Sequence, residues 1–241
     1  MKFKFILNEA DQTVQPKTKD ELKRIIRNTI EEKGYNCDLN FIDVSKITDM
    51  SFLFSTSKFN GDISKWDVSK VKNMDSMFVN AKSFNGDISN WDVSNVKDMQ
   101  HMFSNAESFN QPIGNWNVSK VENMNNMFSG ASGFNQDISK WNVSKVTNMT
   151  AMFRYAHSFN KPIGNWDTSK VTRMGYMFLG AASFNQDISK WNTSKVKDMD
   201  SMFYNASSFN GDIDNWNVSK VENMKTMFKN SPLEDHEPDW Y

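Results

Sequence analysis

The side chains that could carry out acid–base or metal chemistry are few and scattered. The histidines are His101, His157 and His236, and the only cysteine is Cys37. A catalytic triad or a metal centre needs unlike groups gathered in one place. His101 and His157 instead lie in different copies of a repeat, at positions that other copies fill with Ser, Asn, Lys or Glu. The sequence therefore predicts no catalytic residues, no metal site and no cofactor.

An aspartate recurs at one position of the repeat and could suggest a track of cation sites. Proline replaces it in two copies, which interrupts any such track. Asp and Pro both favour turns, so turn formation explains why they alternate at this position. The column consists of Asp62, Asp87, Pro112, Asp137, Pro162, Asp187 and Asp212.

Three further columns could bind ligands, but structural roles explain each of them better. Asparagines could form an amide row for a ligand, yet an internal ladder that satisfies buried turn backbone is favoured. Tryptophans resemble a carbohydrate platform, and paired methionines suggest copper or a hydrophobic groove, but their intervals place both in the core. The columns begin at Asn36, Trp66 and the pair Met74 and Met77.

The candidate binding site comes from departures from the repeat. Most outward positions hold Lys, Asn, Asp or Ser, whereas the copies from Phe134 to Ser208 place larger side chains there. Three of these share one column on consecutive copies, so we expect them on adjacent rungs. Exposed Tyr, Arg and Leu together are typical of an interaction surface, with neutral drift on a solvated convex face as the alternative. This central patch comprises Arg154, Tyr155, Arg173, Tyr176, Leu179 and Tyr204.

These columns arise from a repeat of 25 residues. Phe-Asn recurs at 59, 84, 109, 134, 159, 184 and 209, and a divergent copy beginning at Tyr35 precedes them. The eight copies run from Tyr35 to Pro232. We therefore predict an N-terminal segment at 1–34, one repeat array at 35–232 and an acidic C-terminal tail at 233–241.

The spacing within one copy predicts a strand, a turn and a helix. Val71, Met74, Met77, Phe78 and Ala81 have the single-faced spacing of a helix of about three turns. A preceding serine is a preferred N-cap, and two copies show the fuller capping box, Ser119 to Glu122 and Ser219 to Glu222. The short segment around Ile63 is flanked by turn formers and predicts a strand.

One unit of this size cannot bury enough apolar surface to fold alone, so neighbouring copies must stack. The fold class predicted is an α/β solenoid, leucine-rich-repeat-like, with about eight strand-turn-helix coils and an N-terminal capping helix. Thr18 to Lys33 supplies that helix, because Thr18 and Glu21 form a capping box and Gly34 is a stop signal.

Composition narrows the classes of function. The chain has 241 residues, 38% of them apolar, and a net charge of −1, which offers no field for nucleic acid. The sequence has no run of about 18 apolar residues, so we expect no segment to span a membrane. The first nine residues reach a charge before an export signal could form, so the chain is expected to be cytoplasmic as it stands.

The unit from Phe59 to Ala81 resembles the repeat of the BspA-like leucine-rich-repeat surface proteins, also called the mycoplasma lipoprotein repeat family. The resemblance covers about four fifths of the chain. It implies a leucine-rich-repeat solenoid of bacterial origin, a role in adhesion or recognition at a cell surface, and no catalytic residues. If it governs, the protein is displayed on the surface or secreted.

The function predicted is a non-enzymatic scaffold that recognises a protein or glycan. An enzyme with an unrecognised site and a purely structural spacer are the alternatives. Self-association through the ends of the array or through the central patch is a further expectation.

Overall fold

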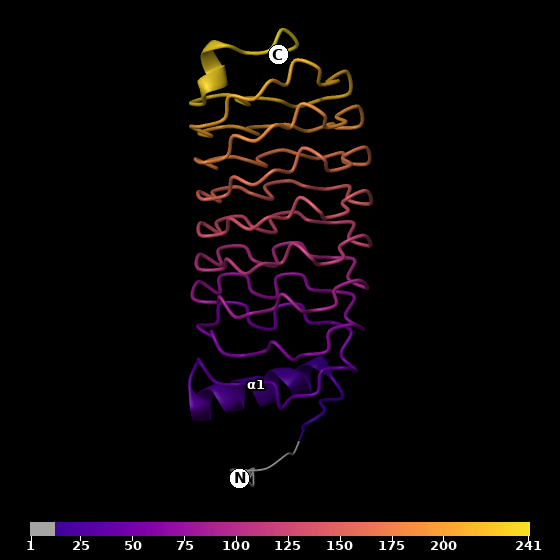
Figure 1. Cartoon of the computed structure of the whole chain (residues 1–241), viewed down its shortest axis with the longest axis vertical. Coiled ribbons are helices and arrows are strands. Elements are labelled where there is room, and N and C mark those ends of the chain that lie inside the picture. The colour runs from indigo at the N-terminus through magenta and orange to yellow at the C-terminus, as the bar shows by residue number, and fades with distance from the viewer. Residues whose placement is uncertain (1–12) are drawn as a thin grey trace.

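The computed structural model describes residues 13–241, which form an elongated stack of coils with the two termini at opposite ends (Figure 1). The helix α1, Lys19–Lys33, lies across the first coil, and the 3-10 helix η1, Pro232–Asp235, follows the last one. The residues from which we predicted that there is no export signal lie outside the described part. No helix within residues 13–241 is long and apolar enough to cross a membrane.

The predicted strand-turn-helix coil is wrong. Within residues 13–241, α1 is the one α-helix and no strand longer than an isolated bridge forms. Single parallel bridges instead join neighbouring coils, one at each step from Asp49 through Asn73 to Asn223. The coils are therefore not those of an α/β solenoid, and residues 13–241 lack the strands and helices that a leucine-rich repeat requires.

Tight turns take the place of the predicted helix. The amide of Met77 bonds to the carbonyl of Met74, and that of Ala81 to that of Phe78, so the bonds span three residues. Every second amide in between points along the stack; Phe78, for example, donates to Met102 in the next coil at 2.9 Å. An apolar side chain every third residue suits successive turns as well as a helix, which explains why the spacing misled the prediction. The serines predicted as helix caps therefore cap no helix.

The predicted strand around Ile63 is likewise a pair of turns. The Asp62 carboxylate accepts the Ser64 amide at 2.9 Å, and the Trp66 amide bonds to the Ile63 carbonyl. The same carboxylate–amide bond recurs at Asp87, Asp137 and Asp187. Turn formation is therefore confirmed as the role of the aspartate column.

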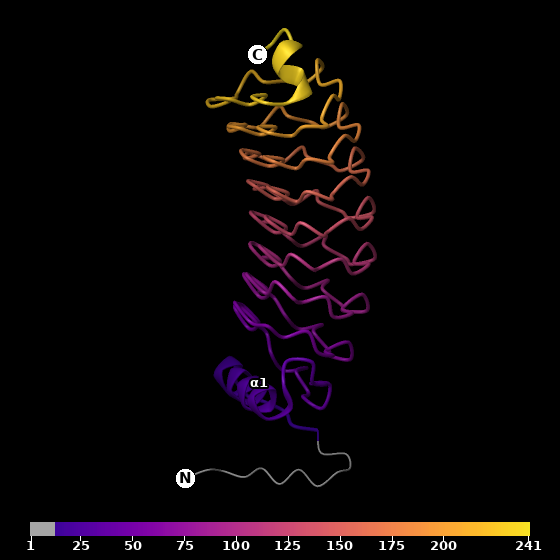
Figure 2. The ribbon, with the colours of Figure 1, turned by 90° about the vertical axis from the view of Figure 1, so that its left-hand side faces the viewer.

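The coils lie one above the next along the molecule (Figure 2), and the core is a set of continuous side-chain columns that run the length of this stack. The phenylalanine, tryptophan and methionine columns are buried, as predicted, with Phe78 stacked on Phe84 at 4.0 Å and Trp66 on Trp91 at 6.4 Å between ring centroids. Each indole N–H of the column donates to a backbone carbonyl of the coil before at 3.0–3.2 Å. Burial of the indole ring therefore leaves no donor unpaired.

The asparagine ladder forms, but the prediction that it is internal is wrong. From Asn60 to Asn185, each side-chain oxygen accepts the amide of the equivalent asparagine in the next coil at 2.8–3.0 Å. The ladder runs along the surface rather than inside, since its members are exposed or half-buried. It fixes the register between coils by satisfying an amide that no carbonyl reaches.

The capping signals at the first end predicted α1 correctly. The Thr18 hydroxyl accepts the Glu21 amide at 3.2 Å, and the helix ends at Gly34, whose amide bonds to Ile30. Leu22 and Ile26 are buried against the core. At the other end, Trp240 of the tail stacks on Trp216 at 6.4 Å, and its indole continues the tryptophan column's bonding.

Candidate functional site

Two positions in each coil hold the backbone in the left-handed region, with φ between 51° and 71°. The second of them is filled by asparagine or glycine in six of the eight coils, residue types that tolerate this conformation. Thr56 and Tyr155 are the exceptions. A large side chain at such a position is strained, and strain of this kind clusters at functional sites.

Tyr155 is accommodated by a glycine in the next coil. A Cβ atom on Gly180 would lie 2.4 Å from Cδ1 of the Tyr155 ring, so no other residue fits there without displacing the ring. The Arg154 guanidinium lies over the same ring at 4.8 Å from its centroid, which is cation–π geometry. Gly180, Tyr155 and Arg154 therefore form one packed unit at the centre of the patch.

Tyr176 lies at the other left-handed position, one coil further on. Its hydroxyl donates to the Asp200 carboxylate, and this bond raises the pKa of the tyrosine above its usual range. Arg154 lies close enough for its charge to act in the opposite direction on that pKa. Tyr155 and Tyr176 are 39% and 37% exposed, so two fixed aromatic rings face solvent on adjacent coils.

The structure gathers only part of the predicted patch. Backbone bonds from Tyr155 to Leu179 and from Gly180 to Tyr204 place the three rungs on successive coils. Leu179 is only 8% exposed, and its amide closes a turn on Tyr176 rather than a helical turn. Tyr204 is half-buried. Arg173 is exposed, but its side chain makes no hydrogen bond or ion pair with any residue in 13–241. The surface that remains is Arg154, Tyr155 and Tyr176.

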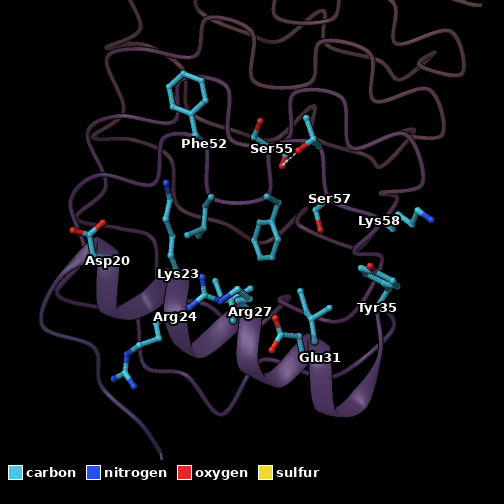
Figure 3. A pocket seen from close by; sticks show the side chains of 15 residues that line it. Asp20, Lys23, Arg24, Arg27, Glu31, Tyr35, Phe52, Ser55, Ser57 and Lys58 are labelled. Atoms are coloured by element: carbon cyan, nitrogen blue, oxygen red, sulfur yellow. Dashed lines mark hydrogen bonds between the residues drawn. The ribbon is translucent and has the colours of Figure 1, made fainter.

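A second surface, which the sequence did not suggest, lies between α1 and the first coil (Figure 3). It is an open groove of about 710 Å³. Phe52 and Tyr35, each 49% exposed, line it, Phe52 from the first coil and Tyr35 from just beyond the C-terminal end of α1. Four basic and two acidic side chains line it, namely Lys23, Arg24, Arg27 and Lys58 with Asp20 and Glu31.

Phe52 was the available signal for this groove. It occupies the first left-handed position, at φ 57°, where the equivalents in other coils are mostly small or polar. The first copy is divergent, so this large residue reads as simple divergence until α1 is seen beside it. The groove forms where the helix packs on the first coil, and the repeat pattern does not predict that contact.

Comparison with known protein families identifies the family of this chain. It matches the family described as "Mycoplasma protein of unknown function, DUF285" over residues 21–141 and again over residues 131–240. The chain belongs to this family. The description names no activity, and the narrower BspA-like identity is supported by no named relative. No curated protein matches the chain.

Proposed function

We propose that this DUF285 chain is a non-enzymatic recognition scaffold that binds a protein through the surface formed by Arg154, Tyr155 and Tyr176. The observation that carries the proposal is the packed unit around Tyr155. A residue type that the backbone disfavours occupies the position, and a glycine on the next coil leaves space for its ring. Neutral variation on a solvated surface requires no such pairing.

The chemistry of the surface favours a protein partner. Tyr and Arg are the residue types enriched at the centres of protein interfaces. Tyr176 and Arg154 each have one fixed contact, with Asp200 and with the Tyr155 ring. Because these contacts hold the side chains in place before binding, less conformational entropy is lost on association.

The test replaces the two tyrosines with residues that the repeat itself uses. Tyr155→Asn and Tyr176→Ser match Asn80 and Ser76 at the equivalent positions, so the double variant is expected to fold. Partners captured from a lysate by the wild type and the variant are identified, and the dissociation constant of each captured protein is measured. We expect binding at least about tenfold weaker, as for the loss of an interface hot spot.

The control is Asn105→Gly, which changes the same column in a coil outside the patch and introduces a residue the column already uses. It should bind the partner like the wild type. A double variant that is folded and binds the same proteins with unchanged affinity would rule out this surface.

A further inference from the structure

The last coil has backbone donors without acceptors. In the coil before it, the amides of Met199, Ser201 and Phe203 donate to carbonyls of the last coil at 2.8–2.9 Å. The equivalent amides of the last coil belong to Met224, Thr226 and Phe228. None of these three amides has a hydrogen-bond acceptor among residues 13–241. Thr226 is exposed and Met224 is half-buried, whereas Phe228 is fully buried, so the accessible edge consists of the amides of Met224 and Thr226. An edge of this kind is a template for pairing with another chain.

The first coil has the matching acceptors. In each later coil, the carbonyls equivalent to those of Asp49, Ser51 and Leu53 accept amides from the coil before. No amide among residues 13–241 donates to these three. The Lys19 ammonium contacts the side chains of Asp49 and Ser51 and leaves their carbonyls unbonded. Donors and acceptors at opposite ends of the molecule thus share a spacing of two residues. Among the acceptor residues, Asp49 is half-buried and Ser51 and Leu53 are buried, which leaves Asp49 as the most accessible of the three.

Apolar burial points to the same end. Val68, Val71 and Met74 are at most 1% exposed, as an interior coil requires. Their equivalents in the last coil are only half-buried, because α1 has no counterpart there. These residues are Val218, Val221 and Met224.

The charges of the two ends are complementary. The segment after the last coil carries exposed acids at Glu234, Asp235, Glu237 and Asp239. The groove beside α1 has an excess of basic side chains, with Arg24 and Arg27 exposed. Opposite charge on the two ends favours contact between one end and the other over contact between like ends.

We infer that copies of this chain associate head to tail, with the last coil and acidic segment of one copy seated on the groove between α1 and the first coil of the next. This interaction is separate from partner binding by the central patch. The two surfaces differ, so the contact leaves a free groove and a free last coil at the ends of each assembly. Such a heterologous contact produces open chains or closed rings rather than two-fold symmetric dimers.

The test uses two charge-reversal variants of exposed residues. Arg24→Glu with Arg27→Glu alters the groove, and Glu237→Lys with Asp239→Lys alters the acidic segment. Sedimentation velocity at increasing concentration should show the wild type exceeding its monomer mass of 27.9 kDa, and less so at high salt. Each variant alone should remain monomeric, because it opposes like charges at every junction.

An equimolar mixture of the two variants is the decisive sample. It should regain the association of the wild type, since every contact between unlike variants again pairs opposite charges. Thermal unfolding of each variant checks that it is folded, and Tyr155→Asn with Tyr176→Ser should associate like the wild type. A wild type that stays monomeric at every concentration, variants that associate normally, or a mixture that stays monomeric would each overturn the inference.

Discussion

The two ends of the stack are closed in different ways. At the first end, α1 satisfies its own backbone bonds and covers the core with Leu22 and Ile26, both at most 4% exposed. At the other end, the segment that begins with η1 covers the aromatic columns through Leu233 and Trp240. It leaves the amides of Met224, Thr226 and Phe228 without described acceptors.

The difference shows what a repeat needs at its limits. Each interior coil has its apolar side chains and its amides covered by the next coil, so a terminal coil needs a substitute for both. A helix covers apolar side chains well but offers few free backbone groups to the coil beside it. Covering the core and pairing the edge are therefore separate requirements, and each end here meets them incompletely.

The largest expected effect comes from removing the better cover. Deleting residues 1–34 exposes Leu39, Phe54 and the rest of the first coil's buried face, so we expect aggregation. Deleting residues 232–241 should instead lower the melting temperature and leave the protein soluble. Light scattering and thermal unfolding of the two truncations distinguish these outcomes. A chain without residues 1–34 that melts like the wild type as a monomer would contradict the role assigned to α1.

The same substitution in an interior coil and in the last coil tests the openness of that end. Val171→Lys buries an ammonium with no described partner and should destabilise the protein by several kcal/mol. Val221→Lys places the charge where the side chain is half-buried, so the loss should be about 1 kcal/mol or less. Denaturant unfolding measures both. Equal losses would show that the last coil is as well covered as the interior.

The tryptophan column gives a smaller contrast. Trp141→Ala removes a ring that is 3% exposed and should cost about 3–5 kcal/mol. Trp240 makes the same indole–carbonyl bond at 3.1 Å but is half-buried, so Trp240→Ala should cost less, on the order of 1–2 kcal/mol. The free energies of unfolding of the two variants provide the comparison. A Trp240→Ala loss as large as that of Trp141→Ala would mean that the tail is part of the core.

The smallest expected effects come from two aspartates of interior coils whose surroundings differ. Bonds from Ser69 lower the pKa of Asp67, so this carboxylate stabilises the fold above the pKa of the unfolded group, and that contribution is lost as pH falls through the folded pKa. Burial raises the pKa of Asp98, so the contribution of this group to the stability of the fold is present below the pKa of the unfolded group and is lost as pH rises through the folded pKa. Both changes to asparagine occur naturally in the repeat, at Asn117 and Asn123.

At neutral pH, Asp98→Asn should therefore increase stability and Asp67→Asn should decrease it. Unfolding by denaturant at neutral and acid pH measures both signs. The difference between wild type and either variant should shrink in acid, where the carboxyls are protonated in both states. Changes of the same sign for the two variants would refute the opposite environments assigned to them.

The sequence predicted which side chains are buried but not the backbone that buries them. Met74, Met77 and Phe78 are in the core as expected, because a three-residue interval has the same inward direction in a turn as in a helix. The left-handed residues decide between the two, and side chains such as Ser76 and Ala151 give no sign of that conformation. The coil thus depends on bonds between coils, which a pattern within one copy does not specify.

The candidate site was predictable to a similar extent. The column shared by Arg154, Leu179 and Tyr204 follows from the repeat period, whereas the burial of Leu179 depends on turn geometry. The sequence did not reveal that the Tyr155 ring packs in the space left by Gly180 of the next coil. The groove beside α1 could not be predicted, because it lies between the helix and a coil of unrelated sequence.

Residue-level amide hydrogen exchange tests the account most directly. The bonding between coils predicts slow exchange for Met199, Ser201 and Phe203, whose amides donate to the last coil. It predicts fast exchange for Met224 and Thr226 in the monomer, and protection of these two amides when copies associate. Slow exchange of Met224 and Thr226 in dilute monomeric protein would show that the last coil is already paired and would contradict the open edge.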